Sequence, residues 1–194
     1  MIGLERGKVL IVPYQAGWKS AFRREAALLR STFGAGLLGV EHIGSTAVEG
    51  MAAKPIIDLM CAVAALGEAW AFRPRLEALG YEYRPDEAVP DRLFFAKGPR
   101  SRRTHHLSLS EPGSRFYEEK LLFRDYLRAH AEAAEEYRSL KEELAGRYAD
   151  NRASYTEGKR PFVERILALA RAELEAGRPT ALSPSRKPRR GEMR

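Results

Sequence analysis

An aspartate interrupts one of the most apolar segments of the chain. Residues 55–63 read PIIDLMCAV, so Asp58 stands between two isoleucines and a Leu-Met pair. Large and β-branched apolar side chains in a short run predict a buried strand. Because an unpaired carboxylate is unfavourable in an apolar interior, we expect Asp58 at a strand end or in a cleft, beside a cation or a metal ion. A simple ion pair with nearby Lys54 is the alternative.

The residues before this strand are suited to hold a phosphate. Residues 42–46 read HIGST, and Gly44 permits a tight turn that a ligand can approach closely. Ser45 and Thr46 are good capping residues for a short helix through 46–53. A helix N-terminus offers unpaired N–H groups and a partial positive charge, which favour an anion. A purely structural Gly-Ser turn is the alternative.

The remaining segments alternate between strand and helix patterns. Further short strands are predicted at 8–12, 40–43, 81–85, 91–98 and 104–111. Helices are predicted from Gly17 to about Arg30 and from Gly67 to Leu79, the second interrupted or begun late at Pro74 and ended by Gly80.

After Pro112 the apolar spacing is helical to the end of the body. One stripe comprises Tyr137, Leu140, Leu144 and Tyr148, and a second comprises Val163, Ile166, Leu167, Ala170 and Leu174. We expect both stripes to face the core, with Pro161 in the first turn of the last helix. Strands alternating with helices, followed by a helical third, predict an α+β or a mixed α/β fold.

Most of the net charge belongs to the C-terminal segment. The chain has 194 residues and a formal charge of +7. Residues 178–194 hold six basic side chains against one acidic one, which is +5 of that total. This segment is rich in Pro, Ser and Arg and lacks aromatic residues, so we predict a basic, disordered tail. Weak binding to RNA through the tail is one reading; a solvated terminus without a specific partner is the favoured one.

Composition favours a cytoplasmic protein. No apolar run is long enough for a membrane span, and residues 1–14 lack the apolar region and cleavage site of a signal peptide. Cys61 is the single cysteine and lies in an apolar run. We therefore expect it to be a buried, inert thiol, and we expect no membrane partner.

The chain resembles a known family. The Gly-Ser turn, the short helix and the aspartate on the next strand are similar to the nucleotidyltransferase (polymerase β-like) superfamily. Residues 42–59, HIGSTAVEGMAAKPIIDL, more closely resemble the GrpB family, an uncharacterised protein family. The match continues in THHLSL (104–109), FRDYLRAH (123–130), EYRSLKEELA (136–145) and YTEGKRPFVERIL (155–167). It covers residues from about 8 to 172, and relatives of this module fused to dephospho-CoA kinases hint at nucleotide or CoA-related ligands.

The resemblance implies a fold and an incomplete metal site. It implies a nucleotidyltransferase-like mixed sheet with packed helices over residues 1–177, helical from about 114. Gly44 and Ser45 take the phosphate-turn role, and Asp58 takes the role of the first metal-binding, catalytic carboxylate. The superfamily's second carboxylate follows two residues later, where this chain has Met60, and a thioether does not replace an oxygen ligand of Mg²⁺. We therefore expect Mg²⁺ binding to be weak.

The third carboxylate of the superfamily normally comes from a neighbouring strand. The candidate strand 104–111 puts His106, Ser108 and Ser110 on one face, and none of them is an acid. A metal site made of His105 with His106 is disfavoured, because adjacent strand residues face opposite ways.

Basic residues in the matching motifs form a second candidate site. His42, Lys54, His106, Arg124 and Lys159 would converge on Ser45 and Thr46 to form an anion pocket that needs little or no metal. Two of them have plain alternatives. Arg124 would pair with Asp125 or a surface glutamate, and Lys159 would be a solvated residue at a helix entry.

Three functional hypotheses follow. The first is a protein of this fold that binds a nucleoside triphosphate or related phosphorylated small molecule, with nucleotidyl transfer as its candidate reaction. The second is a non-catalytic nucleotide- or anion-binding module with a degenerate metal site. The third is an RNA-associated accessory protein that acts through its tail. If metal-dependent transfer occurs, the missing carboxylates are to be sought at Glu41, Glu49, Asp86 and Asp91; acceptor, base and oligomeric state stay open.

Overall fold

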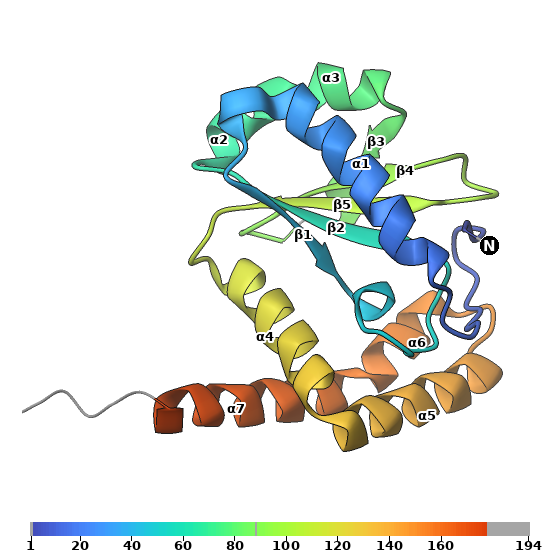
Figure 1. Cartoon of the computed structure of the whole chain (residues 1–194). Helices are drawn as coiled ribbons and strands as arrows, with labels where there is room; N and C mark the ends of the chain where they lie inside the picture. Colours follow the sequence, from blue (N-terminus) through green and yellow to red (C-terminus); the bar gives the residue numbers. More distant parts are fainter. Residues whose placement is uncertain (1, 88, 178–194) are drawn as a thin grey trace, which may run out of the picture.

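A single mixed sheet forms the centre of the protein (Figure 1). The computed structural model describes residues 2–87 and 89–177, and within them five strands pair in the order β1-β2-β5-β4-β3. The strands are β1 (Gly39–Ile43), β2 (Ile57–Ala62), β3 (Tyr81–Tyr83), β4 (Leu93–Lys97) and β5 (His105–Ser110). β2 and β5 are parallel, and the other neighbours are antiparallel. The predicted α+β class and mixed sheet are confirmed.

Two groups of helices pack around this sheet (Figure 1). The first comprises α1 (Gly17–Phe33), α2 (Leu66–Ala69) and α3 (Arg73–Ala78), with 3₁₀ turns η1 (Gly34–Gly36) and η3 (Trp70–Phe72). The second comprises α4 (Arg115–Ala129), α5 (Ala131–Arg147), α6 (Arg152–Gly158) and α7 (Arg160–Gly177). α4 packs beside β1, and the second group surrounds the loop between β1 and β2. Among the described residues, no helix is long and apolar enough to cross a membrane.

The predicted alternation along the strands is confirmed. Ile57, Leu59 and Cys61 of β2 join the main core beneath α1, together with Leu107 and Leu109 of β5. Asp58 and Met60 point to the opposite face, where the register pairs them with His106 and Ser108. Cys61 is buried as predicted, and burial raises the pKa of its thiol to about 12, which explains why an unreactive thiol is expected.

The sequence prediction was wrong for residues 8–12, which form no strand. Val12 makes one isolated bridge to Ala53, and the Val9 N–H donates to the Ala149 carbonyl. Val9 packs with Leu144 and Tyr155. Helical groups border this segment instead of a sheet edge, so Val9 is buried without a β-ladder while Leu10 is 47% exposed.

The short helix predicted through residues 46–53 is reduced to one 3₁₀ turn, η2 (Ser45–Ala47). Val48 is already extended and Gly50 has φ +76°, so the chain leaves helical geometry at once. The N-cap residue of this turn is Gly44, which has no side chain to cap it. The prediction that a helix N-terminus holds a phosphate here was therefore wrong, because no α-helix follows the turn.

Two other helical predictions need adjustment. The helix predicted at 67–79 is broken into α2, η3 and α3, with Pro74 in the first turn of α3, which agrees with the predicted interruption. The last stripe is buried at Ile166, Leu167 and Ala170, but Leu174 is 54% exposed, because α7 extends beyond the helices that it packs against. The predicted tail, 178–194, lies outside the described residues.

Candidate anion-binding site

The site is built around a turn that only glycine fits. Gly44 follows β1 with φ +69° and ψ −175°, a backbone region that residues with a Cβ avoid. A Cβ at this position would lie 2.6 Å from Asp58 Oδ2. The register pairs Ile43 with Asp58, so the turn passes directly over the carboxylate. Gly44 thus lets the backbone approach Asp58.

Asp58 is hydrogen bonded to a histidine on the next strand. His106 is its partner in the parallel β2–β5 pairing, and His106 Nδ1 lies 3.0 Å from Asp58 Oδ1. The His106 ring meets the edge of Phe94. Asp58 is in the second position of β2 and its side chain is 36% exposed. The carboxylate is therefore partly solvated and already has a hydrogen-bond partner, and that partner is His106 instead of Lys54.

A cavity of about 220 Å³ opens beside this pair. From the turn and the sheet it is lined by Gly44, Ser45, Thr46, Ala53, Lys54, Asp58 and His106. From α5, α6 and the junction to α7 it is lined by Tyr137, Lys141, Arg152, Tyr155, Thr156 and Lys159. The structure thus brings together seven of the residues predicted from sequence: Gly44, Ser45, Thr46, Lys54, Asp58, His106 and Lys159.

Three lysines in this cavity have pKa values well below the ordinary value for lysine. Burial lowers the pKa of Lys54 to about 7, and the charges of Lys159 and Arg152 add to the effect. Burial and the charge of Lys159 lower the pKa of Lys141 to about 7 as well. The pKa of Lys159 is lowered by burial to about 8, with Asp58 opposing the shift. Mutual repulsion and desolvation therefore bring the pKa values of these three ammonium groups close to neutral pH.

Aromatic rings and a carbonyl group, instead of carboxylates, hold the three ammonium groups. Lys54 Nζ and Lys159 Nζ lie 4.3 and 4.4 Å from the centre of the Tyr155 ring. Lys141 Nζ donates to the Ala52 carbonyl and lies 4.8 Å from the Tyr137 ring centre. Such contacts position cations without neutralising them.

The fourth cation, Arg152, is ion paired. Its guanidinium donates to both carboxylate oxygens of Glu87, at 3.0 and 2.7 Å. Its place in the lining of the cavity is therefore fixed by a bidentate contact.

Two predicted residues lie outside the lining of this cavity. His42 pairs with Leu59 across β1–β2, on the face opposite Asp58. It stacks on Phe22 at 4.6 Å, and its Nε2 lies 3.0 Å from Thr46 Oγ1. Burial lowers the pKa of His42 to about 4, so this ring is neutral at pH 7 and supports Thr46 from behind the turn.

Arg124 is the second of these residues. It donates to Glu41 at 2.7 Å, to both Asp125 oxygens at 2.7 and 2.9 Å, and to the His42 carbonyl at 3.1 Å. The structure therefore has the Asp125 pairing expected as the alternative, and Arg124 joins α4 to β1.

Sequence reasoning missed several lining residues on the helices: Tyr137, Lys141, Arg152, Tyr155 and Thr156. A signal was present for one of them. Lys141 falls within the apolar stripe between Tyr137 and Leu144 and is 1% exposed. A lysine in the middle of a core-facing stripe predicts a buried cation, and a buried cation calls for an anion nearby.

The side chains of this site do not fit the metal ions that the resemblance implies. Asp58 is the one carboxylate among the described residues of the lining, and no group of three His, Cys, Asp or Glu in residues 2–87 and 89–177 is placed to hold a metal. Met60 is 0% exposed, so the position of the second carboxylate is closed. Glu41 faces Met60 across β1–β2, but its carboxylate is bonded to Arg124.

The other acids named as replacements lie outside the cavity lining as well. Glu49 is paired with Lys19 at 2.7 Å, and Asp86 is paired with Arg84 at 2.6 Å. Asp91 accepts a bond from Ser110 through its backbone carbonyl. The side chains around Asp58 are thus mainly basic, whereas a Mg²⁺ site requires oxygen ligands such as carboxylates.

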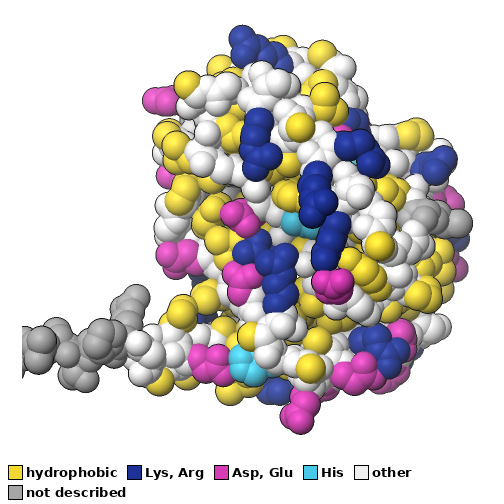
Figure 2. Space-filling view, viewed as in Figure 1, with side chains coloured by type: hydrophobic (Ala, Val, Ile, Leu, Met, Phe, Trp, Pro, Cys, Tyr) yellow, Lys and Arg dark blue, Asp and Glu magenta, His cyan; other side chains and the backbone are white. Residues whose placement is uncertain are grey.

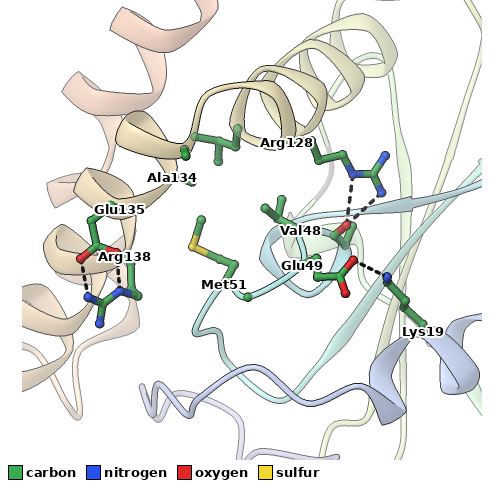
Figure 3. Close-up of a pocket in the computed structure, with 12 residues that line it drawn as sticks. Lys19, Val48, Glu49, Met51, Arg128, Ala134, Glu135 and Arg138 are labelled. Atoms are coloured by element: carbon green, nitrogen blue, oxygen red, sulfur yellow. Dashed lines mark hydrogen bonds and ion pairs between the residues drawn. The ribbon is translucent and has the colours of Figure 1, made fainter.

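A larger groove of about 560 Å³ lies on the other side of the 45–51 loop (Figure 3). Val48 and Met51 face Ala134 of α5 across it. Its charged side chains already have partners: Lys19 with Glu49, Arg138 with Glu135, and Arg128 with the Ala47 carbonyl. Acidic groups also lie among the basic ones on the face shown in Figure 2. The smaller cavity is therefore the better candidate for an anion site.

Comparisons with known proteins agree on one family. The family model described as "GrpB protein" matches residues 8–169. UPF0157 protein YqkA of Bacillus subtilis (strain 168) is 38% identical over 157 residues, which are 81% of this chain and 46% of YqkA. The chain thus spans less than half the length of that relative. Glutamate-rich protein GrpB of Alkalihalophilus pseudofirmus is 35% identical over 171 residues, 86% of this chain and 98% of that protein.

Solved structures give a consistent result. The crystal structure of conserved protein GrpB from Enterococcus faecalis superposes with a TM-score of 0.80 at 33% identity, covering 86% of this chain and 99% of that chain. The Cid1 poly(U) polymerase, in a mutant bound to MgATP, aligns more weakly, with a TM-score of 0.48 at 16% identity over 71% of this chain and 45% of that chain. By the extent of the family match and the identity to full-length relatives, this chain belongs to the GrpB family.

Proposed function

We propose that the protein binds a nucleoside triphosphate or a related phosphorylated small molecule in the cavity beside Asp58. The observation that carries the proposal is the gathering of Lys54, Lys141, Lys159 and Arg152 around a cavity in which Asp58 is the one carboxylate among the described lining residues. A cluster of poorly solvated cations is unfavourable by itself, and an anion in its midst restores their charge.

The proposed contacts use both sides of the cavity. Ser45 and Thr46 contribute hydroxyl groups from the turn, while the lysines contribute ammonium groups from the loop and the helices. Charge-assisted hydrogen bonds to phosphate are among the stronger polar contacts in proteins. His42 supports this arrangement from behind through its contact with Thr46.

Binding without metal-dependent transfer is the favoured form of this proposal. Asp58 is bonded to His106 and is surrounded by cations, so the lysines occupy the electrostatic role that Mg²⁺ has in a two-carboxylate site. Nucleotidyl transfer stays the second candidate. It rests on the sequence resemblance of the Gly44–Ser45 turn and Asp58 to nucleotidyltransferases.

A thermal-shift screen with two matched variants tests the proposal. ATP and CoA are added to the wild type with EDTA or with Mg²⁺, and we expect at least one of them to raise Tm in EDTA. Lys159→Ala should lose most of that rise. Lys19→Ala removes the same charge from the separate groove and should keep it. Equal ligand responses in the two variants, or no response in wild type, would contradict the proposal.

A further inference from the structure

We infer that this cavity selects its ligand by the phosphate groups and not by a nucleobase, so that inorganic triphosphate binds at least as well as ATP. This inference rests on the proposed function and narrows its substrate class. It follows from two properties of the lining: its basic groups can bind a phosphate chain, and its side chains provide few contacts for a base.

The aromatic rings of the lining have no free face for a base. Tyr155 is 2% exposed, and the ammonium groups of Lys54 and Lys159 lie over its ring. Tyr137 is 5% exposed and stacks on Phe162 with ring centres 5.0 Å apart. Base recognition commonly uses an open aromatic face as a stacking platform. Both tyrosines have already used their faces on protein groups.

The uncharged polar groups are also largely engaged. Thr46 Oγ1 is bonded to His42, and the Ser45 side chain is hydrogen bonded to the Tyr137 hydroxyl. The part of the lining that the structure describes contains neither Asn nor Gln, the side chains that pair with a base edge through two hydrogen bonds. The further uncharged hydroxyl groups among the described residues of the lining belong to Thr156 and to Tyr155, and Tyr155 is 2% exposed. Two hydroxyl groups, one of them buried, are too little to discriminate between bases.

The volume and charge of the cavity match a phosphate chain. At about 220 Å³ it is smaller than the roughly 300–1,000 Å³ of pockets that enclose a drug-sized ligand, so a nucleoside would remain largely outside. Among the described residues of the lining, three lysines share the single carboxylate of Asp58, while Arg152 is paired with Glu87; this excess of basic groups favours the ligand with the most negative charge. Inorganic triphosphate has more charge than ATP and lacks the nucleoside, so it satisfies both constraints.

The experiment is a calorimetric titration of the full chain with a fixed set of probes in EDTA. The probes are ATP, GTP, CTP, UTP, sodium tripolyphosphate, pyrophosphate and phosphate. We expect the four nucleotides to have Kd values within about threefold of one another, tripolyphosphate to bind as tightly as ATP or tighter, and phosphate to bind weakest. One nucleotide that binds more than about tenfold tighter than the other nucleotides and tripolyphosphate would overturn the inference.

Two variants separate this inference from the proposal beneath it. Lys159→Ala should weaken ATP and tripolyphosphate by the same factor, whereas Lys19→Ala should change neither. If Lys159→Ala weakens ATP but leaves tripolyphosphate unchanged, the phosphate-selective reading is overturned while nucleotide binding stands. If no probe binds the wild type at all, the proposed function itself is overturned, and this inference with it.

Discussion

Gly44 and Asp58 are in such close contact that a Cβ on the glycine would lie 2.6 Å from the Asp58 Oδ2 atom. The glycine is therefore required by a residue of the protein itself, before any ligand is considered. Its φ of +69° with ψ −175° adds backbone strain for any other residue.

Gly44→Ala should accordingly lower the free energy of unfolding by about 1–3 kcal/mol and displace the Asp58 carboxylate. Urea unfolding measures the first effect. A double variant provides the control: with Asp58→Ala as background the nearest clashing oxygen is gone, so Gly44→Ala should cost less. Equal costs in both backgrounds would show that backbone strain alone, without the Asp58 contact, sets the requirement.

Met60→Asp tests whether the buried position two residues after Asp58 can hold a second metal-binding carboxylate. From sequence alone, an aspartate here would complete a pair of acids on one strand face. Met60 is 0% exposed, so the variant should bury a charge and lower the free energy of unfolding by at least about 2 kcal/mol. Met60→Leu, a swap of similar volume, should cost less than about 1.5 kcal/mol. A stable Met60→Asp protein with tighter Mg²⁺ binding would contradict this interpretation.

His42 should make the stability of the fold sensitive to mild acid. Burial lowers the pKa of His42 from 6.5 to about 4, so between these values the unfolded chain binds a proton that the folded chain excludes. The free energy of unfolding should therefore fall as pH decreases from about 6.5 to about 4, by roughly 3 kcal/mol from this group.

His42→Gln removes the titrating group and can keep a hydrogen bond to Thr46. Urea unfolding between pH 7 and pH 4 should show a flatter pH dependence for this variant than for wild type. Parallel profiles would mean that the acid sensitivity arises elsewhere.

Lys141→Met should separate stability from ligand binding. Lys141 is 1% exposed and burial lowers its pKa to about 7, so an apolar side chain of similar length should be tolerated, or should raise Tm, in the free protein. The same change removes a cation from the cavity and should weaken ATP binding about tenfold or more. Thermal unfolding and calorimetry measure the two effects. A large loss of Tm together with unchanged affinity would contradict the functional role of Lys141.

The sheet and the Asp58 strand could be predicted because their patterns are local. The period-two alternation through Ile57, Asp58 and Leu59 fixes the faces of β2, and the same argument holds for β5. The failed strand at 8–12 shows the limit of this reasoning: an apolar run predicts neither how much of it is buried nor which element packs against it, because both depend on tertiary packing. η2 ends early for a similar reason, since Val48 is extended and Gly50 adopts a positive φ, and a propensity argument assigns neither conformation.

Half of the cavity lining could not be predicted in the same way. Ser45 and Lys54 are neighbours in sequence of Asp58, whereas Lys141, Arg152 and Tyr155 reach it only through the packing of α5 and α6. Arg124 and His42 show the converse. Both belong to segments next to the site. His42 lies on the face of β1 that turns toward Thr46, and Arg124 lies on the face of α4 that turns toward Glu41, so both side chains contact protein partners.

The most direct test of the central claim is calorimetry of ATP binding in EDTA at pH 8, in two buffers with different heats of ionisation. At this pH Lys54 and Lys141, with pKa values of about 7, are mostly neutral in the free protein, and an anion in the cavity should raise those pKa values. The account predicts binding with net uptake of about one to two protons, and weaker binding as the pH increases further. No binding, or binding with identical heats in both buffers, would contradict it.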